Sequence, residues 1–193
     1  MKKKRLLFRR YTFLVFTLLS FSVSNAQDFI IGAKLGMGNS FYKRQSDELE
    51  TARYLTQKYA LSFEYSPYFS RFLIVSGIEF DKNSLGSTVT IPLGFRITVG
   101  KSVQPFIEGG GYYTVNLKDK SEEYILKNHI GVRIGLGIFY KINRNWRIEA
   151  GYFWKFGLAP GLDEEILLPG NQVEYEHYNL YGQNIELSVK YLF

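Results

Sequence analysis

Residues 180–193 read Leu-Tyr-Gly-Gln-Asn-Ile-Glu-Leu-Ser-Val-Lys-Tyr-Leu-Phe, and the alternation within them indicates the class of fold. Apolar residues occupy every second position toward its end, and polar residues fill the positions between them. Because successive side chains of a β-strand point to opposite faces, this spacing predicts a strand with one apolar and one polar face. The apolar positions are Ile185, Leu187, Val189, Tyr191 and Phe193.

The same alternation recurs in seven earlier segments of the chain. The connectors between the segments alternate between long and short, which is the pattern of an up-and-down membrane barrel. Each segment is near or above the ~9–11 residues that a tilted strand needs to cross a bilayer. We expect a bulge at Pro92, loops or a helical turn in residues 42–58, and a long loop over residues 159–178. The predicted strands are 29–41, 59–65, 71–80, 87–99, 104–117, 128–140, 146–156 and 180–193.

Residues 1–26 are predicted to be a cleaved signal peptide, which leaves residues 27–193 as one barrel domain. A basic head precedes an apolar run too short for a membrane-spanning helix, and Ser24-Asn25-Ala26 supplies the small residues of a cleavage site. The segment holds six of the 24 Lys and Arg residues and none of the 18 acidic ones. The remaining chain is formally neutral, which argues against nucleic-acid binding. The chain has no cysteine, so it forms neither a disulfide nor a lipid-modified cysteine.

Three features predict that the apolar face points outward into lipid. Tyr, Trp and Phe gather near both ends of the predicted strands, as two membrane interfaces would select. The polar face is rich in glycine, which suits a narrow interior. Its charges also nearly cancel, and buried charges require partners. We therefore expect an all-β, eight-stranded, antiparallel, up-and-down transmembrane β-barrel with a polar interior filled by side chains. A soluble lipocalin-like barrel, with the apolar face inside, is the alternative. The expected interior network comprises Lys34, Glu64, Glu79, Arg96, Glu108, Arg133, Arg147, Glu149, Lys155, Glu186 and Lys190.

The chain resembles the small outer-membrane β-barrel family typical of the Bacteroidetes, which includes PorT-like proteins. The resemblance lies in Ile31-Gly-Ala-Lys-Leu-Gly36, Ile91-Pro-Leu-Gly94, Pro105-Phe-Ile-Glu-Gly-Gly-Gly111 and the terminal Tyr-Leu-Phe. It implies an outer-membrane barrel inserted by the outer-membrane assembly machinery, with the apolar residues of the last strand as the insertion signal. It implies no reaction, and a PorT-like role in protein secretion follows by association only.

The sequence offers little catalytic chemistry, and we expect neither an enzyme nor a cofactor or metal site. His129 is interpreted as a polar residue at a membrane boundary. His177 lies among acidic residues of the last connector, which could hold a divalent cation but are better explained as a solvated loop. The glycine-rich segments precede no helix, so they are not phosphate-binding loops. The acidic cluster comprises Asp163, Glu164, Glu165, Glu174, Glu176 and His177.

The sequence therefore predicts a non-enzymatic outer-membrane barrel with a structural or interaction role. Because eight strands leave an interior just filled by side chains, it should not be a general porin. The expected partners are outer-membrane lipid and lipopolysaccharide, the assembly machinery during insertion, and an unknown protein that contacts the long loops. A PorT-like accessory of secretion, a lipid-modifying enzyme that uses His177, and a soluble ligand-binding barrel are the alternatives.

Overall fold

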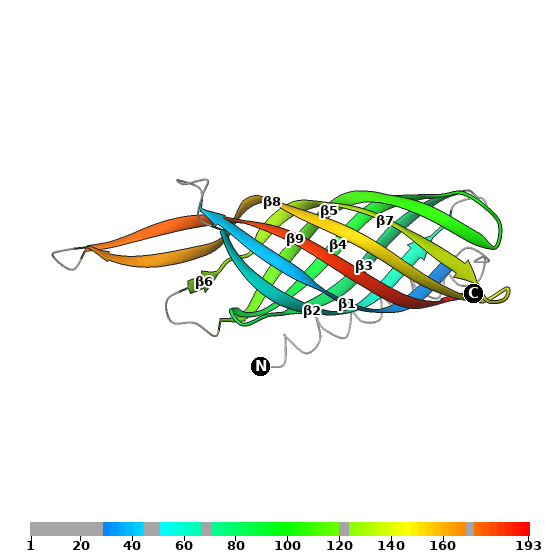
Figure 1. The fold of residues 1–193 in the computed structure, drawn as a ribbon, viewed down its shortest axis with the longest axis horizontal. Coiled ribbons are helices and arrows are strands. Elements are labelled where there is room, and N and C mark those ends of the chain that lie inside the picture. Colours follow the sequence, from blue (N-terminus) through cyan, green and yellow to red (C-terminus); the bar gives the residue numbers. More distant parts are fainter. Residues whose placement is uncertain (1–28, 45–50, 67–70, 120–123, 169–171) are drawn as a thin grey trace, which may run out of the picture.

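A computed structural model describes residues 29–44, 51–66, 71–119, 124–168 and 172–193, and these form a closed antiparallel β-barrel (Figure 1). The predicted signal peptide lies outside the described residues. Eight long strands build the wall, and a three-residue strand is added to the outer part of one of them. The strands are β1 (Phe29–Arg44), β2 (Thr51–Tyr65), β3 (Phe72–Lys82), β4 (Gly86–Thr98), β5 (Val103–Asp119), β6 (Tyr124–Leu126), β7 (His129–Lys141), β8 (Trp146–Leu168) and β9 (Gln172–Leu192).

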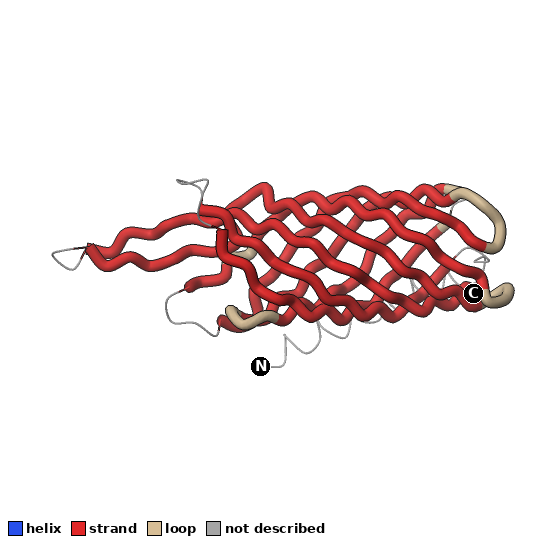
Figure 2. The backbone as a smooth tube through the Cα atoms, viewed as in Figure 1, coloured by secondary structure: helices blue, strands red, loops and turns tan. Residues whose placement is uncertain are grey.

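Closure depends on the last strand. β9 pairs with β1 along one side, from Ile30 opposite Leu192 to Arg44 opposite Tyr178, and with β8 along the other. The remaining long strands pair in sequence order, so the barrel wall has no free sheet edge (Figure 2). The terminal alternating segment therefore joins the two ends of the sheet. This pairing gives the backbone N–H and C=O groups of both strands hydrogen-bond partners, which acyl chains could not supply.

The apolar faces of the strands point away from the barrel axis, which confirms the predicted orientation. Leu93, Ile107 and Leu187 are each at least 60% exposed. Alternate residues on the same strands are buried inside, where most of the large buried side chains are charged or polar. A lipocalin-like barrel would show the opposite arrangement, so that alternative is wrong. Among the described residues, no helix is long and apolar enough to cross a membrane, a finding that has no bearing on spans made of strands.

Aromatic side chains on the outer face form edge contacts near both ends of the barrel. At the short-turn end, the ring centroids of Trp146 and Tyr191 lie 5.1 Å apart, and Phe193 packs on Tyr191 at 4.9 Å. Toward the long-loop end, Trp154 contacts Tyr152 at 4.6 Å. These positions match the aromatic bands of transmembrane barrels, where amphipathic rings sit at the lipid–water boundaries.

The long loop predicted over residues 159–178 is wrong. β8 and β9 continue as paired strands to Leu168 and Gln172 and form a hairpin that projects well beyond the barrel wall (Figure 1). The register of the pair shifts on both sides of Pro160, where the hairpin leaves the barrel. Polar composition hid these strands, because the backbone pairing of a two-stranded ribbon does not require apolar alternation.

Two other local predictions are also wrong. Residues 42–44 belong to β1 and residues 51–58 to β2, so the loops or helical turn expected over residues 42–58 are mostly strand. Pro92 causes no bulge, because the β3–β4 register is the same on either side of it. The pairing ladder is merely interrupted there, and the Ser76 hydroxyl donates a hydrogen bond to the Pro92 carbonyl at 2.9 Å. The register shift of β4 falls between Ser87 and Thr88 instead.

We predict that Ile138→Lys destabilises the barrel by about 2–4 kcal/mol in a lipid bilayer. Ile138 is an outward residue of β7, and its partner Ala150 lies midway between Trp146 and Trp154 on β8. The reason is the cost of placing an ammonium group at the depth of the acyl chains. Unfolding by urea in phospholipid vesicles measures the effect. Ile142→Lys is the matched control, since Ile142 is similarly exposed but lies in the β7–β8 turn. It should cost about 1 kcal/mol or less. Equal costs at the two positions would contradict a membrane-spanning wall.

Candidate functional site

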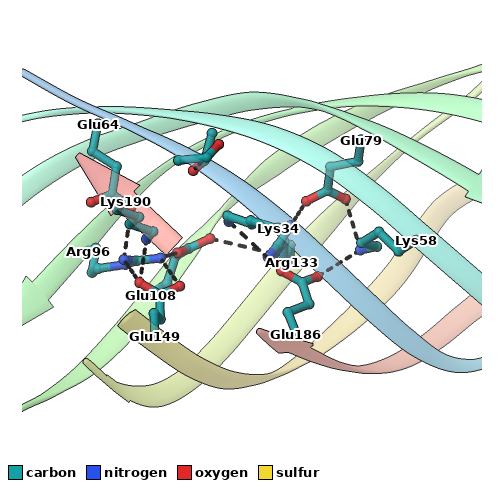
Figure 3. A network of polar contacts seen from close by, with 12 residues as sticks. Lys34, Lys58, Glu64, Glu79, Arg96, Glu108, Arg133, Glu149, Glu186 and Lys190 are labelled. Atoms are coloured by element: carbon teal, nitrogen blue, oxygen red, sulfur yellow. Dashed lines mark hydrogen bonds and ion pairs between the residues drawn. The ribbon is translucent and has the colours of Figure 1, made fainter. Parts of the chain in front are cut away.

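The interior of the barrel holds a chain of charged side chains, which we call the lumen network (Figure 3). Ten of the eleven residues expected to face inward are buried in it, whereas Arg147 is only partly buried. Each comes from an inward position of an alternating strand, so the period of two places it there. The ten are Lys34, Glu64, Glu79, Arg96, Glu108, Arg133, Glu149, Lys155, Glu186 and Lys190.

Arg96 on β4 organises the part of the network nearer the short turns. Its guanidinium donates to Glu64 at 2.9 Å and to Glu108 at 2.6 Å, and it also bonds to Glu149. The Lys190 ammonium group contacts Glu64 and Glu149 as well. Five strands thus contribute to one cluster. The planar guanidinium suits this position because its five donors can serve several carboxylates at once.

Arg133 on β7 organises the next part of the network. It bonds to Glu79 and donates to Glu186 at 2.9 Å. Its Nε lies 3.5 Å from Glu108, the same carboxylate that pairs with Arg96. Glu108 therefore links the two clusters, and the charges form one continuous network along the lumen.

Sequence reasoning missed two members, Lys58 and Asp81. Lys58 Nζ donates to Glu79 at 2.9 Å and to Glu186 at 2.8 Å. Asp81 accepts a bond of 3.0 Å from Lys155. Both residues lie just outside the predicted strands 59–65 and 71–80, although they continue the inward parity of Glu64 on β2 and Glu79 on β3. Extending the alternation past the apolar part of each strand could have found them.

Aromatic rings pack between the ions on the inner face. The guanidinium of Arg133 lies 3.9 Å from the centroid of the Phe153 ring, and that of Arg96 lies 4.2 Å from the Phe106 ring. Gly135 makes room for Phe153, because a Cβ there would come within 2.1 Å of the ring. Small and large inward residues therefore alternate across the strands, and the rings occupy space that ions alone would leave open.

The buried positive and negative charges of the lumen are paired with one another, which is typical of a side-chain-filled interior and not of a reactive site. Within the described part of the chain, six buried cations meet five buried glutamates and the mostly buried Asp81. The carboxylates of the network accept bonds from Lys or Arg, so each charge is compensated where water is scarce. No group of His, Cys, Asp and Glu among the described residues could hold a metal ion. The arrangement fills space and fixes the register of the strands.

A polar cavity of about 30 Å³ lies at the long-loop end of the lumen. It is lined by residues including Asp81, Thr90, His129 and Lys155. His129 is 4% exposed and faces this cavity, so its interpretation as an interfacial residue is wrong. Its Nδ1 lies 3.2 Å from the carbonyl oxygen of Lys127, which fixes the ring. Such a volume has room for about one or two water molecules and not for a substrate.

The predicted acidic cluster lies on the projecting hairpin. Backbone pairing places Asp163 opposite His177 and Glu164 opposite Glu176. His177 is exposed. The side chains of Asp163, Glu164, Glu165, Glu174 and Glu176 lie outside the described residues, so cation binding there stays a prediction.

We predict that Arg96→Met destabilises the barrel by about 3–5 kcal/mol, because three carboxylates lose their shared cation inside a closed wall. Urea unfolding in detergent micelles, followed by the shift in migration between heated and unheated samples on a gel, measures the loss. Arg53→Met is the matched control, since Arg53 is exposed on β2 and, among the described residues, contacts the Asn39 side chain and the Phe41 ring. It should change stability by about 0.5 kcal/mol or less. An Arg96 variant as stable as the control would show that the network contributes little.

Comparison with known proteins relates the chain to outer-membrane barrels by fold. Neither a protein-family model nor a curated protein sequence matches it. Neisserial surface protein A (NspA) is similar in structure, with a TM-score of 0.59 and 15% identity over 86% of this chain and 97% of that one. The N-terminal β-barrel domain of Pseudomonas aeruginosa OprF has a TM-score of 0.52 and 11% identity over 85% of this chain and 99% of that one. The chain thus has the fold of small outer-membrane β-barrels.

Proposed function

We propose that the protein is a non-enzymatic outer-membrane β-barrel with a structural or interaction role, and that it is not a general porin. The observation that carries this proposal is that the molecule combines a lumen filled with charged side chains and a hairpin that projects beyond the wall (Figures 1 and 3). The first leaves no pathway of pore size. The second presents backbone and side chains outside the membrane.

The lumen network supports the exclusion of a porin function. The Arg96 and Arg133 clusters, joined through Glu108, extend across the interior from β2, β3, β4, β5, β7, β8 and β9. Water-filled porins have twice as many strands, whereas eight strands enclose a space that side chains fill. Passage of a solute would require several buried ion pairs to separate together.

The projecting hairpin supports an interaction role. Its β9 edge from Gln172 to His177 pairs only with β8 among the described residues, because β1 ends opposite Tyr178. An edge of this kind offers unpaired backbone donors and acceptors to an added strand. The expected partner is a protein segment that lies outside the cell and can adopt an extended conformation.

Location and assembly belong to the same proposal. The predicted signal peptide would deliver the chain across the inner membrane, and the outward aliphatic surface requires lipid around it. The outer-membrane assembly machinery would insert the barrel, with the β9 segment ending in Phe193 as its recognition signal. Outer-membrane lipid and lipopolysaccharide would then surround the wall. Membrane fractionation of cells that express the full chain tests this location.

We predict that the purified barrel in planar bilayers gives no steady conductance in the nanosiemens range typical of porins. The physical reason is the filled lumen, where ions would have to displace paired charges. A known porin, reconstituted in parallel, supplies the positive control. Stable porin-sized steps from the folded protein would overturn the proposal.

We also predict that replacing residues 161–177 by a short turn leaves the barrel folded but abolishes partner binding. The wall does not depend on these residues, since β1 and β9 pair from Ile30 to Arg44 without them. Chemical cross-linking on intact cells measures partner binding, and heat-modifiable gel migration checks the fold. A shortened variant that retains the same cross-linked partners would place the interaction elsewhere.

The PorT-like role in secretion and the lipid-modifying activity remain narrower hypotheses. The first rests on sequence resemblance and is tested by the secreted-protein profile of a strain that lacks this chain. The second assigns catalysis to His177 and is tested by the lipid profile after His177→Ala. Neither has the structural support that the filled lumen and the hairpin give to the main proposal.

A further inference from the structure

The base of the projecting hairpin is joined to the barrel at Gly161. The register of β8 with β9 skips this residue, between Pro160 and Leu162, where the hairpin leaves the wall. The carbonyl oxygen of Gly161 accepts a hydrogen bond of 2.9 Å from the backbone N–H of Lys127. Next to it, Leu126 of β6 pairs with Leu162. The segment that precedes β7 therefore holds one side of the hairpin base on the barrel.

His129, the first residue of β7, lies beside this junction and contacts both of its bonded residues. Its ring is so close to Gly161 that a Cβ there would lie 3.1 Å from the ring Nδ1. The same Nδ1 lies 3.2 Å from the carbonyl oxygen of Lys127. Because a carbonyl oxygen only accepts, Nδ1 of the neutral ring carries the proton and Nε2 is an acceptor. The ring thus supports the hairpin base from inside the lumen.

The surroundings of His129 are suited to a neutral ring. Its Nε2 is buried and has no hydrogen-bond partner among the described residues. The ring lines the small polar cavity together with Asp81 and Lys155. Lys155 Nζ lies 3.0 Å from the Asp81 carboxylate, and Lys58 Nζ lies 3.9 Å from it. A protonated His129 would therefore be a third cation near one carboxylate.

Other groups around the ring do not supply a further negative charge. Tyr112 makes an edge contact with the ring, with 5.8 Å between the centroids, and Tyr42 lines the same cavity. Both phenols are neutral at physiological pH. The titratable and charged groups that face His129 from the described elements are Tyr42 of β1, Asp81 of β3, Tyr112 of β5, Lys155 of β8 and Lys127 before β7.

We propose that His129 makes the hairpin base sensitive to pH: the neutral ring holds the base on the barrel, and protonation releases it. Burial beside Lys155 disfavours the charged ring in the closed form. An open base would expose the ring to water, where imidazole has its ordinary pKa of about 6.5. The open form therefore binds the proton more readily, and acid shifts the population toward it. The functional meaning rests on the proposed interaction role of the hairpin, because release would weaken partner binding in acid.

The distance between two nitroxide labels tests the release directly. The chain has no cysteine and two histidines, so His177→Cys labels the hairpin and leaves His129 as the only histidine. Leu55→Cys places the second label on the outward face of β2. Pulsed EPR in lipid nanodiscs gives the label–label distances at about pH 7.5 and about pH 5, near the two ends of the range in which imidazole titrates. The measurement contains no partner, so it stands or falls independently of the interaction role, which cross-linking tests.

We expect one narrow distance distribution at about pH 7.5 and an added, broader population at about pH 5. If only the open form binds the proton, the ratio of open to closed form rises by about 30-fold between these conditions. His129→Gln is the matched control, because its amide can donate to the Lys127 carbonyl but does not titrate. It should stay narrow at both pH values. His129→Lys carries a lasting charge and should be broad at both, and heat-modifiable migration checks that each variant is folded.

Three results would overturn the proposal. Identical distributions at the two pH values would show that the hairpin base does not respond to acid. A response that persists in His129→Gln would assign it to other groups, such as the acidic residues of the hairpin. A narrow distribution for folded His129→Lys would show that a charge at this position does not release the base.

Discussion

The requirement that every backbone donor and acceptor find a partner inside the sheet governs this structure. Acyl chains cannot accept or donate hydrogen bonds, so a sheet in lipid must have no free edge. β9 meets this requirement by pairing with β1 on one side and β8 on the other. The terminal strand is thus the element through which the fold becomes closed, and its alternation sets the inside and outside of the wall.

Closure with eight strands then determines the character of the interior. The lumen is too narrow for bulk water. The aliphatic residues of the strands occupy the outward positions. Inward positions consequently carry glycine, aromatic rings and paired ions. Arg96 and Arg133 each serve several carboxylates, and Glu108 joins their clusters. The network is a consequence of burying charge in a small space, and its side chains fill much of the interior of the barrel.

The two ends of the barrel differ in how they meet their surroundings. At the long-loop end, β8 and β9 leave the wall near Pro160 and continue as a hairpin with an open edge. At the short-turn end, the strands stop near Trp146 and Tyr191, and exposed cations flank the turns. The first arrangement suits contact with an extended segment of another molecule. A rigid wall between them holds both in place.

The sequence alone determined the eight strands, their order, the outward direction of the apolar face and ten buried members of the lumen network. A period of two is a local property, so it can be read from neighbouring residues without knowledge of the fold. Which charges meet depends on the tertiary structure, because partners such as Lys58 and Glu186 come from strands far apart in the chain. The tertiary structure also decided that Pro92 fits without a bulge and that residues 159–178 continue as strands. Register and closure fix these features, and neither can be inferred from the spacing of apolar residues along the chain.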